Sequence, residues 1–186
     1  GAVVTHLCGT HSAEILAPLR NKGALIGALH PLASFADPER AASQFEGTWC
    51  AIDGDEAAVA LLEKAVEARG GKVLHIQSEG KALYHAGAVF ASNYLVAILE
   101  AALRLFEEAG VPREGAMAPL LKLAGGTLDN IRRVGIPSAL SGPIERGDTA
   151  TVERHREALG RLPELARLYE ALARITAEVA VAKGRR

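Results

Sequence analysis

The chain has 186 residues, of which 49% are hydrophobic and 23% are charged, and its formal net charge is -1. This length allows one sizeable core or two small ones, and this apolar content can offset the entropy cost of folding, which excludes a disordered protein. A near-zero net charge offers no field for nucleic acid or an anionic membrane, so we expect neither as a partner.

The cysteines and the apolar runs indicate the compartment. Cys8 and Cys50 each lie in a short apolar segment, which is typical of buried, reduced thiols in cytosolic proteins. No apolar run reaches the roughly 18 to 20 residues that span a bilayer without polar interruption. The N-terminus has no basic segment ahead of an apolar one. We therefore expect a cytoplasmic protein.

The first 77 residues predict strands that alternate with helices. Apolar runs predict four strands, at 2–7, 25–29, 48–52 and 73–76, and the first of these runs is rich in β-branched residues. Helical spacing predicts helices from Ser12 to Gly23, with Pro18 as a local objection, and from Glu56 to Arg69, where Gly70-Gly71 stops the helix. A polar loop with Asp37-Pro38 crosses the sheet surface. Strands and helices in this order are typical of parallel βαβ units, so the fold class is α/β and residues 1–77 are half of a parallel sheet.

Beyond Gln77 the sequence predicts helices alone. They cover 80–109 and 113–134 and, after a loop at 136–147, continue to the C-terminus. We expect an all-helical domain at 78–186. Its many large apolar side chains need a partner surface, which predicts a homodimer that buries on the order of 2,000 Å² or more. The side chains in question are Leu95, Ile98, Leu99, Leu103, Phe106, Leu120, Leu121, Leu165, Leu168 and Ile175.

A dinucleotide site of the Rossmann type needs a GxGxxG turn between its first strand and helix, and the chain has none. Gly70-Gly71 and Gly125-Gly126 fall at a helix end or inside a helical stretch. Either the protein binds no dinucleotide, or the motif precedes Gly1. Because Gly1 enters a strand almost at once, we favour truncation and expect the isolated chain to bind dinucleotide poorly.

The main polar cluster lies in the segment KALYHAGAVFASNYL. On a helix, Lys81, His85 and Ser92 fall within about 60° of one another, and Asn93 borders this stripe. A lysine and a histidine one turn apart can share proton transfer, with Asn93 orienting a substrate oxygen. The alternative is a solvated lysine beside a histidine that is satisfied in the core.

Two smaller groups complete the candidates. His6, Cys8, His11 and His30 could bind zinc, but their spacing is not a standard one, so we predict no metal site. His6 and His30 end predicted strands, where open parallel sheets bind ligands, and Gly9 forms the turn after the first of these strands. In SGPIERGD, Arg146 could bind an anion, and Asp148 is either a helix N-cap or a site residue.

Three segments, GALHPLASFAD, KALYHAGAVFASNYLVAIL and ALSGPIERGDTATVERH, resemble in order and spacing a family of Rossmann-like proteins. These proteins carry domain of unknown function 2520 and are assigned as NADP-dependent oxidoreductases. The family is similar in plan to pyrroline-5-carboxylate reductase, prephenate dehydrogenase and the β-hydroxyacid dehydrogenases. The resemblance implies the C-terminal half of a Rossmann-type sheet followed by an all-helical dimerisation domain, and a GxGxxG motif in roughly ninety preceding residues.

The resemblance also implies roles. Lys81 occupies a place similar to the catalytic lysine of β-hydroxyacid dehydrogenases, and His85 stands where their asparagine would be. His30-Pro31 looks like the His-Pro that borders the nicotinamide pocket of prephenate dehydrogenases.

We therefore expect the intact protein to transfer a hydride between NADP(H), or NAD(H), and a small carbonyl, hydroxy or imino substrate. Lys81, His85 and Asn93 would be catalytic, and His6 and Gly9 would lie near the cofactor. Substrate would be bound by His30, Ser92, Asn130, Arg146 and Asp148. The rival hypothesis is a non-catalytic helical module for dimerisation or partner binding.

Overall fold

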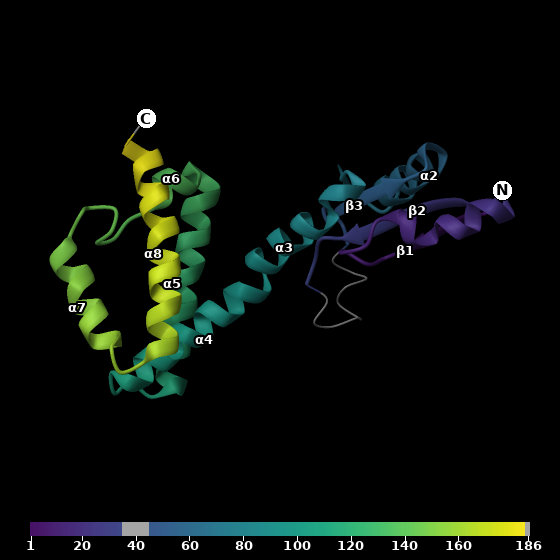
Figure 1. The fold of residues 1–186 in the computed structure, drawn as a ribbon. Helices are drawn as coiled ribbons and strands as arrows, with labels where there is room; N and C mark the ends of the chain where they lie inside the picture. The colour runs from purple at the N-terminus through teal and green to yellow at the C-terminus, as the bar shows by residue number, and fades with distance from the viewer. Residues whose placement is uncertain (35–44, 185–186) are drawn as a thin grey trace. The chain divides into compact units, whose positions relative to one another are not determined.

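The computed structural model describes residues 1–34 and 45–184, and the chain divides into two compact units, Gly1–Ala97 and Ile98–Arg186 (Figure 1). The first unit contains the sheet, and the second is helical. The loop predicted around Asp37-Pro38 lies outside the described residues. The domain boundary predicted between residues 77 and 78 stays a prediction.

The sheet contains the four predicted strands in the order β1-β2-β3-β4. They are β1 (Val3–His6), β2 (Leu25–Pro31), β3 (Trp49–Gly54) and β4 (Lys72–His75). The prediction of an all-parallel sheet is wrong, because β2 and β3 pair antiparallel while β1–β2 and β3–β4 are parallel. Each parallel pair is joined by a helical crossover, as parallel pairing requires. The predicted link from β2 to β3 was a loop, and a loop permits antiparallel pairing.

Helices cover both faces of the sheet. Side chains alternate across a strand, and on β2 the residues Ile26 and Ala28 pack against the 3-10 helix η1 (Ala13–Lys22). Gly27 points the other way, where a Cβ would lie 2.9 Å from Leu62 of helix α2 (Glu56–Glu67). His30 therefore shares the η1 face. Pro18 lies inside η1, and Gly23 ends it with a φ of 76°, as the sequence predicts.

The long helix predicted over 80–109 is interrupted. It consists of η2 (Ser78–Gly80), α3 (Lys81–Ala91) and α4 (Asn93–Glu108), with Ser92 between α3 and α4 in a non-helical conformation. In length and composition the stretch 78–108 could cross a membrane, which corrects the expectation that no run is long enough. One such helix is weak evidence for a span, since helices of soluble proteins pass the same test.

The helical unit contains the C-terminal part of α4 and four further helices. These are α5 (Arg113–Val134), α6 (Ile136–Ala139), α7 (Thr149–Leu159) and α8 (Pro163–Gly184). The limits of α5 are those that the sequence predicts. The core of the helical unit is small: Leu103 of α4 packs against Ala116 and Leu120 of α5. The fold is thus an α/β sheet unit followed by a helical unit, as predicted.

The two cysteines differ. Cys50 is buried in β3, as expected, but the burial predicted for Cys8 is wrong because β1 ends at His6 and Cys8 lies in the exposed loop that follows.

Candidate functional site

The site is built at the carboxyl ends of β1 and β2. These strands are parallel, so their ends meet at one edge of the sheet, where open α/β sheets bind ligands. His30 is at the end of β2, and Gly9 is in the loop after β1. A Cβ on Gly9 would lie 2.4 Å from Cδ2 of His85 and 2.8 Å from Nε2 of His30. Only glycine allows the loop to approach both imidazole rings this closely.

Helix α3 supplies the other half of this group. Tyr84 Oη lies 2.9 Å from Nδ1 of His30, and these two atoms share one hydrogen bond whose donor depends on the imidazole tautomer. The rings of His30 and His85 have centroids 5.8 Å apart. Because Tyr84 and His85 are neighbours at the start of α3, one helical turn sets both against His30.

Electrostatics favour the neutral forms of two of these groups. Burial lowers the pKa of His30 below its usual 6.5, and the charges of His85 and Lys81 lower this pKa further. Burial, followed by the influence of Cys50, raises the pKa of Tyr84 above its usual 10.0. A neutral imidazole bonded to a protonated phenol can both donate and accept a proton near neutral pH.

A cavity of about 640 Å³ opens beside this group. It is bounded by the end of β2 and residues Leu32–Ser34, by Leu74, by α3 and by the start of α4. Its polar lining side chains are those of His30, Ser34, Tyr84, His85, Ser92 and Asn93. The structure thus gathers four predicted site residues, His30, His85, Ser92 and Asn93, around one cavity. The break at Ser92 brings it and Asn93 to the same lining.

Lys81 and His6 lie apart from the cavity lining. The Lys81 side chain is buried, and its Nζ is 3.0 Å from Oδ1 of Asp53 at the end of β3. This excludes the alternative of a solvated lysine. His6 is held by the backbone instead, with Nε2 3.0 Å from the Ser12 carbonyl oxygen and Nδ1 accepting the Cys8 amide proton.

The remaining predicted residues belong to the helical unit. Asn130 is exposed on α5 and accepts a hydrogen bond from Arg133, and Arg146 is exposed in the loop before α7. Asp148 caps α7 by accepting a hydrogen bond from the Thr151 amide, which confirms the predicted N-cap. The binding roles proposed for these three stay predictions.

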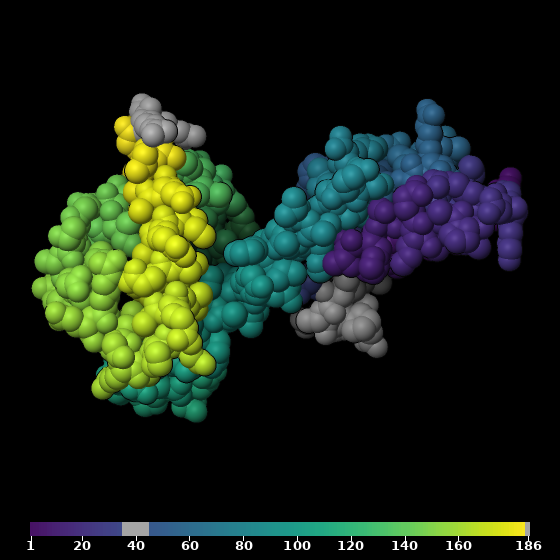
Figure 2. All heavy atoms as spheres, in the orientation of Figure 1, coloured from purple at the N-terminus to yellow at the C-terminus, as the bar shows by residue number. Residues whose placement is uncertain are grey.

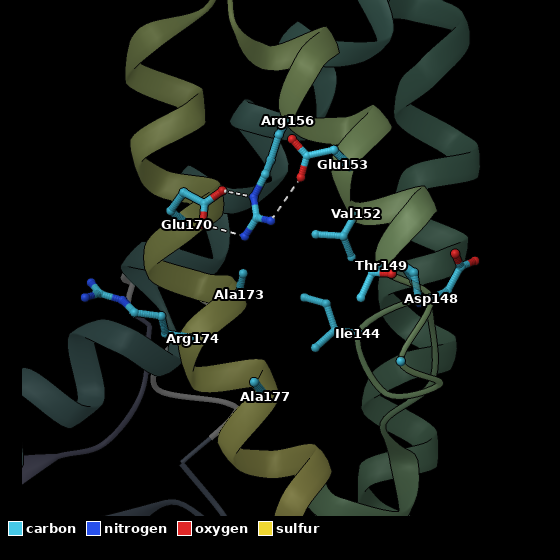
Figure 3. Close-up of a pocket in the computed structure, with 12 residues that line it drawn as sticks. Ile144, Asp148, Thr149, Val152, Glu153, Arg156, Glu170, Ala173, Arg174 and Ala177 are labelled. Carbon is cyan, nitrogen blue, oxygen red and sulfur yellow. Dashed lines mark hydrogen bonds and ion pairs between the residues drawn. The ribbon is translucent and has the colours of Figure 1, made fainter.

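Asp148 also borders a shallow pocket of about 360 Å³ between α7 and α8 (Figure 3). Figure 3 shows that its polar wall is occupied by an ion pair of Arg156 with Glu170, helped by Glu153, so those charges are already satisfied. The rest of its lining combines apolar side chains such as Ile144 and Val152 with those of Thr149 and Arg174.

The described residues form no metal centre. Within residues 1–34 and 45–184, no three histidine, cysteine, aspartate or glutamate side chains gather around one point. Cys8 Sγ lies 3.2 Å from the Thr10 hydroxyl instead.

Sequence reasoning missed two residues of the site region, Tyr84 and Asp53. Tyr84 sits inside the segment that was singled out, but its hydroxyl pairs with a strand 54 residues away. Asp53 follows three buried strand residues, and an acidic residue at the carboxyl end of a strand was a usable signal.

Comparison with known proteins places the chain in a family. The model of DUF2520, "Domain of unknown function (DUF2520)", matches residues 48–176. The chain belongs to the DUF2520 family. Among solved structures it is similar to protein TM1727 from Thermotoga maritima, with 31% identity and a TM-score of 0.85 over 100% of this chain and 71% of that one. No match was found among the curated proteins.

More distant solved structures share the fold. The "putative NADP oxidoreductase BF3122" from Bacteroides fragilis has 22% identity and a TM-score of 0.75, over 95% of this chain and 65% of its own. Pyrroline carboxylate reductase from Plasmodium falciparum, solved with NADP bound, has 12% identity and a TM-score of 0.57, over 96% of this chain and 70% of its own. These likenesses establish the Rossmann-type fold with a helical C-terminal unit.

The residues present fit only one end of a dinucleotide cofactor. Gly9 leaves the loop after β1 without a side chain against two imidazole rings, at the sheet edge where a nicotinamide ring binds in folds of this kind. A glycine-rich turn opening a helix, which a pyrophosphate needs, is absent from the described residues. Of the two residues predicted to lie near the cofactor, Gly9 lies at this edge, and its contact with a nicotinamide stays a prediction.

Proposed function

We propose that this chain is the substrate-binding part of a soluble, cytoplasmic NADP(H)- or NAD(H)-dependent oxidoreductase. The substrate class is a small carbonyl, hydroxy or imino compound. One observation carries the proposal: a neutral imidazole, a phenol and a second imidazole line one cavity at the carboxyl ends of two parallel strands. The DUF2520 fold, shared with a protein solved with NADP bound, supports the cofactor class.

The side chains divide the work by position. His85 and the His30–Tyr84 pair face the cavity and would give or take the proton that accompanies hydride transfer. Ser92 and Asn93 would hold the reacting oxygen or nitrogen by hydrogen bonds. The leucine, alanine and valine side chains of the lining would exclude water. The nicotinamide, when bound, supplies the hydride.

This division departs from the expectation that Lys81 exchanges the proton. Its ammonium is buried against Asp53 and is not among the groups that line the cavity. His85 is therefore the first candidate for that task. In this proposal the pyrophosphate end of the cofactor is held outside the described residues.

We further propose that the protein is a homodimer joined through its helical unit. The buried side chains of residues 98–184 are Leu103, Ala116, Leu120, Leu159 and Leu165. Large apolar side chains stay exposed on the same helices, among them Leu121, Leu123 and Ile175. A second copy would cover them, and an obligate dimer would bury on the order of 2,000 Å² or more. The rival function, a dimerisation module without catalysis, rests on this surface alone.

The experiment uses the intact protein that contains this chain. NADPH and NADH oxidation would be followed with aldehydes, ketones, 2-oxo acids and cyclic imines, in wild type and His85→Gln. The matched control is His75→Gln, which removes an exposed histidine of β4. We expect turnover with at least one class, a loss of about 100-fold or more in His85→Gln, and little change in the control. Absence of nucleotide binding by the intact protein would refute the oxidoreductase proposal and would leave the non-catalytic dimerisation module as the remaining hypothesis.

A further inference from the structure

The feature beyond the cavity is the buried pair of Asp53 and Lys81. Their side chains are 4% and 2% exposed, and Oδ1 and Nζ are 3.0 Å apart. Among the described residues, neither atom has a partner with hydrogen-bond geometry. Attraction between charges therefore holds the pair. This attraction is largely cancelled by the cost of removing both charges from water, so the pair adds little net stability to the fold.

Asp53 connects three segments of the chain. Its Oδ2 accepts a hydrogen bond from the Ala13 amide at 3.0 Å, where η1 begins, and one from the Ser78 hydroxyl at 3.3 Å, in η2. Its Oδ1 faces Lys81, the first residue of α3. The start of α3 is thus fixed to β3 and η1 through one carboxylate.

Fixing Lys81 also fixes the helical turn that carries the site residues. Tyr84 and His85 follow it by three and four residues, so they lie one helical turn further on the same side of α3. The Lys81 ammonium is 6.0 Å from the centroid of the Tyr84 ring, whose hydroxyl binds His30.

We infer that Asp53 and Lys81 are positioning residues: their ion pair fixes Tyr84 and His85 against His30 and places the Lys81 ammonium behind this group. The inference rests on the proposed function for its catalytic consequence. It assigns Lys81 a fixed charge, whereas the resemblance implied a proton donor or acceptor.

The charge of Lys81 acts on neighbouring titratable groups. After burial and His85, Lys81 contributes to the lowered pKa of His30, and it also contributes, after Thr10 and other groups, to the lowered pKa of Cys8. The titratable side chains on elements next to His30 are those of Lys81, Tyr84 and His85 on α3, Cys50 and Asp53 on β3, and His6, Cys8 and His11 on β1 and its loop. Of these groups, His85 and Lys81 are the two whose charges lower the pKa of His30.

An NMR titration of the histidine resonances tests the charge without requiring turnover. His30 is assigned by its loss in His30→Gln. We expect its midpoint below 6.5 in wild type and higher by about half a unit in Lys81→Met. The control Lys64→Met, at an exposed position of α2, should leave it unchanged.

If Lys81→Met does not fold, Asp53→Asn/Lys81→Met removes both charges and keeps an oxygen for the Ala13 amide. A rise in the same direction is expected, but a smaller one, because the carboxylate that opposes the effect of the ammonium on His30 is lost as well. A wild-type midpoint at or above 6.5, or no rise in a folded variant, overturns the inference.

Lys81→Arg separates the two roles of Lys81. Arginine keeps the charge but does not release a proton near neutral pH. A fixed charge predicts that turnover stays within about tenfold of wild type, whereas loss of a proton donor predicts a fall of about 100-fold or more. The second result overturns the inference. If no substrate is turned over at all, the proposed function fails, while the titration still decides the role of the charge.

Discussion

Replacing Lys81 with methionine should destabilise the sheet unit strongly. The substitution leaves the Asp53 carboxylate in a site where its side chain is 4% exposed, without its counter-charge. Removing one partner of a buried ion pair costs about 3 to 5 kcal/mol. Because Asp53 keeps the Ala13 amide and the Ser78 hydroxyl as donors, we expect a loss near the lower end, about 3 kcal/mol.

The double variant Asp53→Asn/Lys81→Met should be more stable than Lys81→Met, although it carries one more substitution. It leaves no buried charge, and the asparagine oxygen still accepts from the Ala13 amide, so we expect a loss of less than about 2 kcal/mol. Such a rescue is what identifies an ion pair, because unconnected substitutions add.

Urea unfolding followed by tryptophan fluorescence measures both effects. The chain has one tryptophan, Trp49, and it lies on β3, so its fluorescence reports on the sheet unit alone. Lys64→Met, on the surface of α2, is the control and should unfold as wild type does. A loss below about 1 kcal/mol in Lys81→Met, or a double variant whose loss equals the sum of the two single losses, would refute the reasoning.

Three further expectations follow from other parts of the structure. Gly9→Ala should lower kcat/KM by about tenfold or more, because the added methyl displaces the rings of His30 and His85, and unchanged steady-state kinetics would contradict this. Asp148→Ala should lower the urea midpoint followed by circular dichroism. The pKa of Asp148 is lowered by its hydrogen bonds to Thr151, so the wild type should be more stable than the variant by the full amount above pH 3.8, and the difference should disappear as the pH falls further. Equal urea midpoints at every pH would show that the cap is unimportant. Leu123→Glu, at a side chain that is 68% exposed, should convert a dimer in light scattering to a monomer of 19.5 kDa, and a wild-type monomer at tens of micromolar would reject the dimer.

Much of the fold could be predicted because local signals were strong. Short apolar runs located all four strands, and Gly23 ended η1 where a left-handed residue was needed. The direction of β3 could not be predicted, since it depends on the link that follows Pro31 and not on the strand itself. The break at Ser92 was also missed, because apolar helical spacing continues on both sides of it.

The candidate site was predictable to a similar extent. His30 was found because it ends a strand, and His85, Ser92 and Asn93 because they share one stripe of a helix. The partner of Lys81 was not found, since Asp53 reads as a turn residue in Asp53-Gly54-Asp55. The burial of a lysine depends on a carboxylate 28 positions earlier in the chain, and helix periodicity holds no information on that distance.

The most direct test of the account follows a deuterium atom from the nicotinamide into the product. The intact protein would be incubated with NADPH that carries deuterium at the transferable position and with the carbonyl or imino compound that supports the fastest turnover. The mass of the product would then be measured by mass spectrometry. The account predicts one deuterium per product molecule in wild type and in His75→Gln, and a rate lower by about 100-fold or more in His85→Gln. Unlabelled product, or the same rate of labelling in His85→Gln as in wild type, would contradict it.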